Sequence, residues 1–452
     1  MLSPAENRKI WTAAMERSRD LLDGRVKNDI EKHRKGWCKL RFTDENGEPL
    51  KNMKVKVDQA THDFGFGANI FMLDEFEDPK YNEKYREQFK EYFNVATVPF
   101  YWNGVEPDEG QPRYDKHSKK VYRRPAPELC MEYCEENGIT PKLHCLVYDK
   151  FIPKWTPRND MEKMEALYEE RMRQISERFS GRMLEFEVIN ELLLEPRWDY
   201  KSVISNKHDI VEWAFDLARK YFPDETLVIN EADHVIELAE ERYRDAYFLL
   251  VENALRNGVD IDKIGLQYHI FTGATTANDE EYEEAVLAGD KLVDPDLILK
   301  GLDIIAQLGL PLELTEVTVP TFGETEEDEE LQADLLELLY SVWFSHPAVN
   351  TVVYWNVPDG YAYIDPDRKD CLWNENKCRG GLWHHDLTPK KSALRLHKLV
   401  HDVWHTTEEL TTDENGYVEF RGFYGEYTAE AGDFAASFGI HKGDSEVTEI
   451  IL

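Results

Sequence analysis

Short β-like segments alternate with amphipathic helix-like segments over most of this chain, and the alternation limits the folds available to it. The β-like segments are rich in β-branched and apolar residues, whereas segments such as 158–179 repeat apolar side chains at helical spacing. Eight strands that alternate with helices predict an α/β fold, a closed parallel (β/α)8 TIM barrel. The expected strands are Asp63–Phe71, Phe93–Trp102, Thr140–Tyr148, Leu184–Glu191, Glu225–Asp233, Lys263–Phe271, Pro311–Val319 and Val349–Val357.

The two ends of the chain carry a different pattern. Residues 1–35 are charged and periodic, which predicts a helix and a connector. Residues 36–62 alternate around an Asn46-Gly47 turn, and residues 406–452 alternate around an Asn415-Gly416 turn. Either segment alone would be small and would leave strand edges exposed. We therefore expect both to combine into one accessory β-sandwich beside a catalytic barrel of residues 63–405.

The charge balance limits the partners of the protein. The 452 residues include 54 basic and 89 acidic side chains, a net charge of −35. Nucleic acid and anionic membrane surfaces bind through basic patches, so neither is an expected partner. No segment is apolar for long enough to span a membrane, and the first residues lack an apolar signal-peptide core. The compartment stays open between the cytoplasm and export with a removed signal, and the oligomeric state stays open too.

Polar residues stand at the ends of most expected strands. In a parallel barrel the carboxyl ends of the strands meet at one mouth, where barrel enzymes carry their active sites. The stretch Leu184–Leu192 is mostly apolar until it reaches Asn190 and Glu191, and Pro311–Val319 carries Glu316. Two carboxylates at one mouth indicate acid/base chemistry. Further side chains at these ends are His144, Tyr148, Asn230, Glu231, Gln267, His269, Tyr354, Trp355 and Asn356.

Several of these segments resemble the motifs of glycoside hydrolase family 10, the family of retaining β-1,4-xylanases. The acid/base signature of that family resembles EVINE (187–191), and its nucleophile signature resembles LELTEVTV (312–319). Its strand-three, strand-six and strand-eight patterns resemble LHCLVY (143–148), GLQYH (265–269) and YWNVPDGYAY (354–363). The match runs in the right order over about residues 60–405, which is more specific than any one motif.

The resemblance implies a double displacement with retention of configuration, in which two carboxyl groups act on opposite faces of the sugar. Glu191 would be the general acid and then the base, and Glu316 would be the nucleophile. Gln267 and His269 would position Glu316. The implied substrate-binding residues are His144, Tyr148, Asn190, Gln267, His269, Trp355 and Tyr363. No cofactor and no metal is implied, and the implied partner is a carbohydrate.

The sequence also departs from the family at positions that bind sugar. A Glu-Asn pair and a Lys normally stand in strand two, but Thr97–Trp102 reads TVPFYW and keeps only the Trp. Tyr148 and Asp149 replace a Trp-His pair, and Tyr363 replaces a second Trp. The expected substrate is therefore a xylan-type or related plant polysaccharide or oligosaccharide.

Two alternatives stay open. The same mechanism could act on a non-xylan β-glycoside, or the barrel could bind carbohydrate without turnover. A barrel enzyme acting on phosphates is disfavoured because no Gly-rich phosphate loop follows strands seven and eight.

Overall fold

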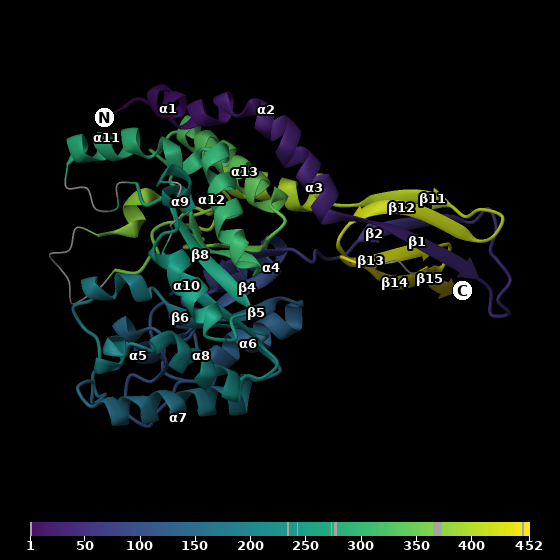
Figure 1. The fold of residues 1–452 in the computed structure, drawn as a ribbon. Coiled ribbons are helices and arrows are strands. Elements are labelled where there is room, and N and C mark those ends of the chain that lie inside the picture. Colours follow the sequence, from purple (N-terminus) through teal and green to yellow (C-terminus); the bar gives the residue numbers. More distant parts are fainter. Residues whose placement is uncertain are drawn as a thin grey trace.

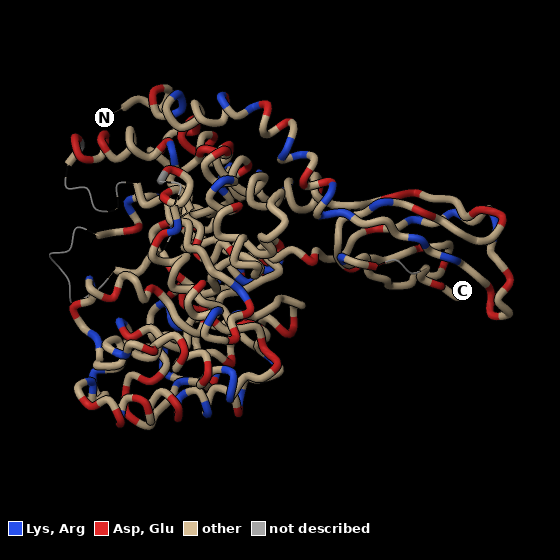
Figure 2. Tube along the Cα trace, in the orientation of Figure 1, with Lys and Arg blue, Asp and Glu red and all other residues tan. Residues whose placement is uncertain are grey.

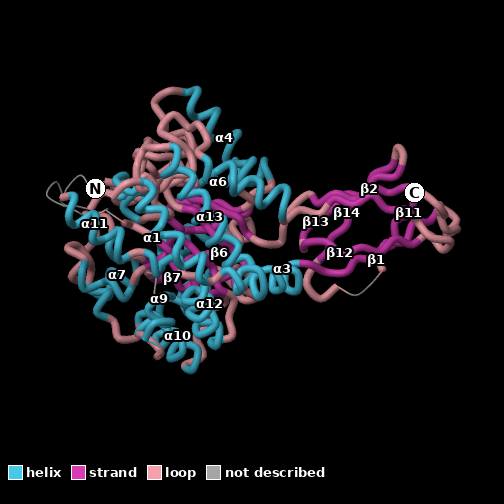
Figure 3. The backbone as a smooth tube through the Cα atoms, turned by 90° about the horizontal axis from the view of Figure 1, so that it is seen from above, coloured by secondary structure: helices cyan, strands magenta, loops and turns pink. Residues whose placement is uncertain are grey.

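Eight parallel strands close into a barrel at the centre of the molecule (Figures 1 and 3). The computed structural model describes residues 2–232, 235–241, 243–272, 274, 278–364, 373–444 and 447–452. Each strand lies within one expected segment, and Asp233, the last residue of the fifth segment, lies outside the described residues. The (β/α)8 fold is therefore confirmed. In their order around the barrel, the strands are β10 (Val349–Tyr354), β3 (Gly65–Asn69), β4 (Val95–Pro99), β5 (Thr140–Val147), β6 (Glu185–Asn190), β7 (Thr226–Glu231), β8 (Lys263–His269) and β9 (Leu312–Thr318).

Helices surround the barrel and cover the outer face of its strands (Figure 3). They are α4 (Pro79–Tyr92), α5 (Trp102–Val105), α6 (Pro127–Asn137), α7 (Met161–Phe179), α8 (Ile210–Tyr221), α9 (Val235–Glu241), α10 (Ala246–Arg256), α11 (Asp279–Ala288), α12 (Pro295–Ile305), α13 (Glu326–Ser345) and α14 (Lys391–Lys398). Short 3-10 turns lie at Asp149–Phe151, Leu192–Arg197, Val203–Asn206, Asp290–Val293, Ala306–Leu308 and Glu375–Cys378, and a π-helical turn lies at Leu399–Val403.

Both faces of the barrel strands are buried. In β6, Phe186 stacks on Phe222 at the end of α8 with ring centroids 4.2 Å apart, while Glu187 points to the barrel interior and contacts His144. A strand covered on both faces reads as a nearly continuous buried run, and five of the six residues of β6 are buried. The few charged residues of such strands must then find partners inside the barrel.

The N-terminal helices run along one side of the barrel toward the second domain (Figure 1). They are α1 (Pro4–Arg17), α2 (Arg19–Leu21), a π-helical turn (Leu22–Val26) and α3 (Lys27–Arg34). Trp11 is fully buried, and its ring centroid lies 4.7 Å from that of Phe322. At the far end, Arg34 donates hydrogen bonds to the carbonyls of His346 and Val349, each at 2.6 Å. These contacts attach the helices to the barrel at both ends.

Strands from the two ends of the chain form a β-sandwich that projects from the barrel (Figures 1 and 3). One sheet has the order β12-β1-β15 and the other has the order β11-β2-β13-β14. The bounds are β1 (Lys35–Thr43), β2 (Lys54–Gln59), β11 (Thr407–Thr411), β12 (Tyr417–Phe423), β13 (Gly425–Ala431), β14 (Phe434–Ile440) and β15 (Thr448–Ile451). Both sheets contribute to one core, in which Leu40, Val57 and Tyr427 are fully buried. The expected pairing of the two ends is therefore present.

Acidic and basic residues are interspersed along the barrel helices and the sandwich (Figure 2). Within the described residues, no helix is both long and apolar enough to cross a membrane.

The shared core predicts that an N-terminal residue governs the stability of the sandwich. Leu40→Ala removes a fully buried side chain, so we expect the free energy of unfolding of the sandwich to fall by about 2–5 kcal/mol. Lys54→Ala, on the exposed side of β2, should change it by no more than about 0.5 kcal/mol. Chemical denaturation followed by far-ultraviolet circular dichroism measures both, and equal effects would contradict the shared core.

Candidate active site

The two predicted carboxylates come from β6 and β9, which are separated by β7 and β8 around the barrel mouth. Glu191 follows the last residue of β6, and its φ of +53° turns the chain out of the strand. The Tyr148 hydroxyl donates a hydrogen bond to Oε2 of Glu191, and Nε2 of Gln267 donates to its Oε1 at 3.2 Å. Gln267 itself pairs in register with Glu316 on the adjacent strand. Glu191 and Glu316 therefore face one small volume.

Shifts in strand register orient the side chains of this volume. The pairing of β8 with β9 runs from Leu266–Leu314 to Gln267–Glu316, so β9 has one extra residue, Thr315. Strict alternation from Glu313 would direct Thr315 inward and Glu316 outward. Because of the extra residue, both side chains reach the same buried amide, that of Asn230. Such irregularities are common beside active sites, where they redirect a side chain.

Asn230, at the end of β7, joins the residues of the site. Its Nδ2 donates to Oδ1 of Asn190 at 2.8 Å and to Oε1 of Glu316 at 3.1 Å. Its Oδ1 accepts a 2.6 Å hydrogen bond from the hydroxyl of Thr315. Gln267 donates a second hydrogen bond to Oδ1 of Asn190, at 3.3 Å. The amide of Asn190 is therefore held in one orientation before any ligand arrives.

Glu316 is in a setting that disfavours its charge. Burial raises the pKa of Glu316 to about 8, and the negative charges of Glu187 and Glu191 add to the rise, against the opposing effects of His144 and the hydrogen bond from Asn230. Two carboxyl groups in one buried site cannot both ionise freely, so the pair keeps a proton near neutral pH. Burial thus favours the protonated form of Glu316, the expected nucleophile, in the free site.

The pKa values of two histidines beside Glu316 shift in opposite directions. Nε2 of His269 lies 3.3 Å from Oε2 of Glu316, and its Nδ1 lies 3.0 Å from the hydroxyl of Thr318. Burial lowers the pKa of His269 to about 4, so its ring is neutral. For His144, burial acts to lower the pKa, but the charge and hydrogen bond of Glu187 outweigh it and the net shift is upward.

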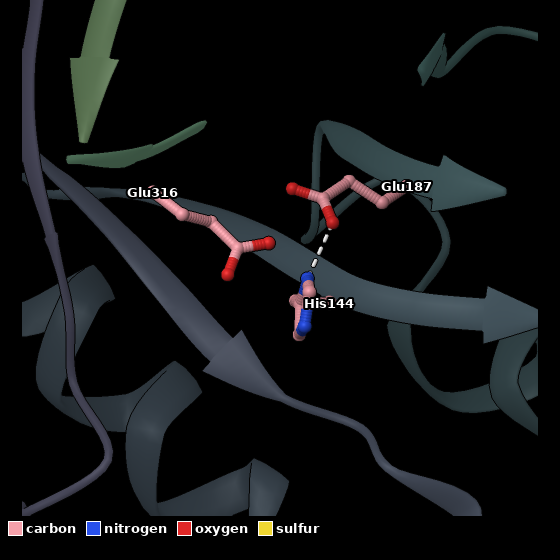
Figure 4. A group of neighbouring side chains, drawn as sticks. All are labelled: His144, Glu187 and Glu316. Atoms are coloured by element: carbon pink, nitrogen blue, oxygen red, sulfur yellow. Dashed lines mark hydrogen bonds and ion pairs between the residues drawn. The ribbon is translucent and has the colours of Figure 1, made fainter. Parts of the chain in front are cut away.

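Figure 4 shows how His144 lies between Glu187 and Glu316. Its Nδ1 is hydrogen-bonded to Glu187, and its Nε2 lies 2.9 Å from the hydroxyl of Tyr101. One ligand-type atom from each of the three labelled residues lies within 4.8 Å of the others, a spacing that a metal ion could use. Both ring nitrogens of His144 are already bonded and a lysine holds Glu187, so this donor set suits a proton better than a metal.

Behind Glu187, a chain of buried charges fills the barrel interior. Nζ of Lys142 lies 2.8 Å from Oε1 of Glu187, 2.6 Å from Oε1 of Glu313 and 3.4 Å from Oε1 of Glu185. Lys263 pairs with the other oxygen of Glu185. Burial and the charge of Glu185 raise the pKa of Glu313 to about 8, so this carboxyl holds a proton. Two lysines therefore face two ionised glutamates and one neutral one.

Aromatic rings form the wall of the site on the side of β3, β4 and β10. The centroid of Trp355 lies 5.3 Å from that of His144 and 5.1 Å from that of Phe71. Tyr101 lies 5.0 Å from His144 and 6.2 Å from Tyr148. Tyr363 lies one layer further out, with its ring 6.3 Å from Phe151.

The structure brings most of the predicted residues together. Glu191, Tyr148, Asn190 and Gln267 form one bonded group, and Asn230 links it to Glu316. The other predicted residues lie around this group, namely His144, His269, Trp355 and, in the outer layer, Tyr363. The hydrogen bonds of Gln267 go to Glu191 and Asn190 rather than to Glu316, which was the expected partner.

Sequence reasoning did not assign a role to several residues of the site. Asn230 and Glu231 were recognised only as strand ends, yet Glu231 accepts a 2.7 Å hydrogen bond from the backbone NH of Leu193, just after Glu191. Glu187 and Lys142 were overlooked. Their signal was present, because charged residues at alternate positions of a buried strand must pair inside the barrel.

The contact with Glu187 predicts an unusually basic His144. Its pKa should lie above 6.5, and Glu187→Gln should bring it below 6.5 because burial remains without the charge. Nitrogen chemical shifts of the imidazole measure this, with His144→Gln identifying the signal. The pKa of His144 is higher in the folded state than in the unfolded state. The contact with Glu187 therefore stabilises the fold fully below pH 6.5, and this stabilisation is lost as the pH rises through the folded-state pKa. Titration of His144 below 6.5 in the unsubstituted protein would contradict the contact.

The buried charges predict a large loss when one lysine is removed. Lys142→Met leaves Glu185 and Glu187 short of a cation inside the barrel, so we expect about 3–5 kcal/mol of destabilisation. Lys116→Met breaks a more exposed ion pair with Glu132 and should cost about 1 kcal/mol or less. Denaturant unfolding compares the two variants, and a Lys142→Met protein as stable as the control would contradict the network.

With this geometry described, comparisons with known proteins identify the family. The model of "Glycosyl hydrolase family 10" matches residues 58–380. Anti-sigma-I factor RsgI6 of Acetivibrio thermocellus is 26% identical over 88% of this chain and 45% of that protein. Endo-1,4-beta-xylanase 2 of Arabidopsis thaliana is 25% identical over 91% of this chain and 34% of that protein. The chain thus spans less than half the length of these two relatives.

Among solved structures, native xylanase 10B of Thermotoga maritima shares the fold. It is 20% identical, with a TM-score of 0.57, over 75% of this chain and 95% of that chain. The family model covers well over half of the sequence and includes both predicted carboxylates. This chain belongs to glycosyl hydrolase family 10.

Proposed function

We propose that this protein hydrolyses β-glycosidic bonds with retention of configuration, using Glu191 as acid/base and Glu316 as nucleophile. The observation that carries the proposal is the pair of carboxyl groups, Glu191 and Glu316, which is joined through Asn190, Asn230 and Gln267 and in which burial favours the protonated form of Glu316. A retaining glycosidase needs one protonated and one ionised carboxyl group on opposite faces of the scissile bond. Family membership supports the same reaction.

In the first step, Glu191 donates its proton to the leaving oxygen while Glu316 attacks the anomeric carbon. Positive charge develops on the sugar, and this charge favours the ionised form of Glu316 over the protonated form of the free site. The Tyr148 hydroxyl and the Gln267 amide hold Glu191 in position. The hydrogen bond from Asn230 holds Glu316.

In the second step, ionised Glu191 takes a proton from water, which attacks the glycosyl-enzyme and releases the sugar. Nζ of Lys150 lies 3.8 Å from Oε2 of Glu191 and forms an ion pair with it. Neutral His269 stays beside Glu316 without pairing its charge, so the ester bond can break.

We infer that the substrate is a xylan-type or related plant β-glycan or oligosaccharide. The support is the similarity to endo-1,4-beta-xylanases and the aromatic wall of Phe71, Tyr101 and Trp355, because aromatic faces can stack on the apolar faces of sugar rings. A second candidate function is binding of carbohydrate without turnover. The observation in its favour is the end of β4, where Phe100 is buried and the Tyr101 hydroxyl is bonded to His144.

Aryl β-xylobiosides test the two roles separately. Glu191→Ala should cut turnover about 10²–10⁴-fold for a poor phenol leaving group and far less for dinitrophenol, which leaves without a proton. Glu316→Ala should abolish turnover of both. Glu109 is an exposed carboxylate in the loop after β4 and serves as the control. The Glu109→Ala variant should cleave both aryl xylobiosides as fast as the unsubstituted protein does.

The first product also carries a signature. Proton spectra recorded early in the reaction should show the β-anomer, because two inversions restore the configuration. An α-anomer would contradict the role of Glu316. Tight binding of xylo-oligosaccharides without turnover of any aryl β-glycoside would favour the second candidate.

A further inference from the structure

Two consecutive arginines, Arg123 and Arg124, lie buried behind the aromatic wall of the site and differ in their partners. Arg123 donates a 2.8 Å hydrogen bond from Nη2 to Oδ1 of Asn356 and another from Nη1 to the carbonyl of Tyr361. Arg124 donates only from Nη1, to the carbonyl of Arg123 at 2.9 Å. Among the described residues, its Nε and Nη2 have no hydrogen-bond partner, and the side chain makes no ion pair.

Three buried lysines of this protein face carboxylates, whereas the buried Arg123 and Arg171 donate to amide or carbonyl oxygens. Lys142 faces Glu187 and Glu313, Lys263 faces Glu185, and Lys390 lies 2.6 Å from Asp359. Burying a cation without an anion costs free energy unless its N–H groups find other acceptors, and among the described residues two nitrogens of Arg124 find none. The exposed fraction of Arg124 is 7%, and burial lowers the pKa of its guanidinium to about 10.

The unpartnered edge of Arg124 is still accessible. Its Nε and Nη2 retain contact with solvent-accessible space, whereas Nε and Nη1 of Arg171 are fully enclosed without partners. These two nitrogens of Arg124 form one edge of the guanidinium, and their parallel N–H groups match the two oxygens of a carboxylate. The aliphatic part is fixed against Gly104, where an added Cβ would lie only 2.9 Å from Cγ of Arg124.

The guanidinium of Arg124 packs against the aromatic wall of the candidate active site. The guanidinium carbon of Arg124 lies 4.0 Å from the ring centroid of Tyr101, and 5.5 Å from those of Phe71 and Tyr363. The hydroxyl of Tyr101 lies 2.9 Å from Nε2 of His144. Only one ring therefore separates Arg124 from the residues that surround Glu316.

We propose that Arg124 binds the carboxylate of a uronic acid carried on, or next to, the reacting sugar. The inference rests on the proposed glycosidase function and narrows its substrate class to acidic β-glycans. The net charge of −35 acts against acidic ligands at long range, but it is screened beyond about 10 Å at 0.1 M salt. Inside the wall the local cation decides, and a bidentate guanidinium–carboxylate pair is among the strongest hydrogen-bonded contacts.

The test compares each acidic ligand with its uncharged counterpart. The first pair is a xylo-oligosaccharide with a glucuronic acid branch and the same compound with its carboxyl group reduced to the alcohol. The second pair is an aryl β-glucuronide and an aryl β-glucoside, which tests a terminal uronic acid instead of a branch. We measure kcat/KM with the unsubstituted protein and Kd with Glu316→Ala by calorimetry.

The acidic member of one pair should be preferred about tenfold or more, as expected for hydrogen bonds to a charged group. Arg124→Gln should bring the ratio of acidic to uncharged ligand in kcat/KM or affinity to about one. Arg124→Lys should keep only part of the preference, because an ammonium group lacks the two parallel N–H groups of a guanidinium. Lys119→Gln removes an exposed positive charge from the same loop and should leave the ratio unchanged. Thermal melting checks that each variant is folded.

The unsubstituted protein and the Arg124→Gln variant each test the proposal. If it cleaves the uncharged ligands and shows no preference for either acidic one, the role of Arg124 is wrong while the glycosidase function stands. A preference that survives in folded Arg124→Gln also overturns it. The two proposals can also separate in the other direction. If Glu316→Ala binds an acidic ligand tenfold more tightly than its uncharged counterpart, and the unsubstituted protein cleaves no ligand, the role of Arg124 stands and the proposed function is wrong.

Discussion

The placement of the proposed catalytic groups depends on the ion pairs buried in the barrel. Lys142 and Lys263 bridge β5 and β8 to β6 and β9 through Glu185, Glu187 and Glu313. A barrel interior is usually filled with branched apolar side chains, which would not fix the positions of charges. Buried ion pairs are weak evidence for stability but very costly to break one at a time. The strands that carry Glu191 and Glu316 are therefore held to their neighbours by contacts that tolerate little displacement.

The same ion pairs control charge at the site. Glu187 contacts Lys142 with one oxygen and His144 with the other, and its charge outweighs burial so that the pKa of His144 is raised. His144 opposes the rise in the pKa of Glu316 that burial causes. In the proposed reaction, the positive charge that develops on the sugar then favours the ionised form of Glu316. The interior of the barrel thus acts on the chemistry through a chain of contacts, without touching the sugar.

Much of the fold could be predicted because it follows from local pattern. Eight apolar segments between amphipathic helices allow few architectures other than a barrel, and residues at the carboxyl ends of its strands must meet at one mouth. The pairing of the two chain ends followed from edges that neither could cover alone. Glu191 and Glu316 could be predicted as site residues because each lies at or near the carboxyl end of a strand.

What the sequence concealed depends on register and on partners distant in the chain. The extra residue Thr315 turns Glu316 inward, and alternation alone would have turned it outward. Gln267 was expected to contact Glu316 but bonds Glu191 and Asn190, because neighbouring strands fix which side chain is within reach. Arg124 had no visible role, since only the fold shows that it lies against Tyr101.

The most direct measurement of the central claim is covalent trapping of the nucleophile. A 2-deoxy-2-fluoro β-xylobioside with a good leaving group slows the second step more than the first, so a glycosyl-enzyme should accumulate. Mass spectrometry of proteolytic fragments should then find the sugar on the peptide that contains Glu316. A label on Glu191, or turnover of the parent glycoside with no labelled peptide, would contradict the account.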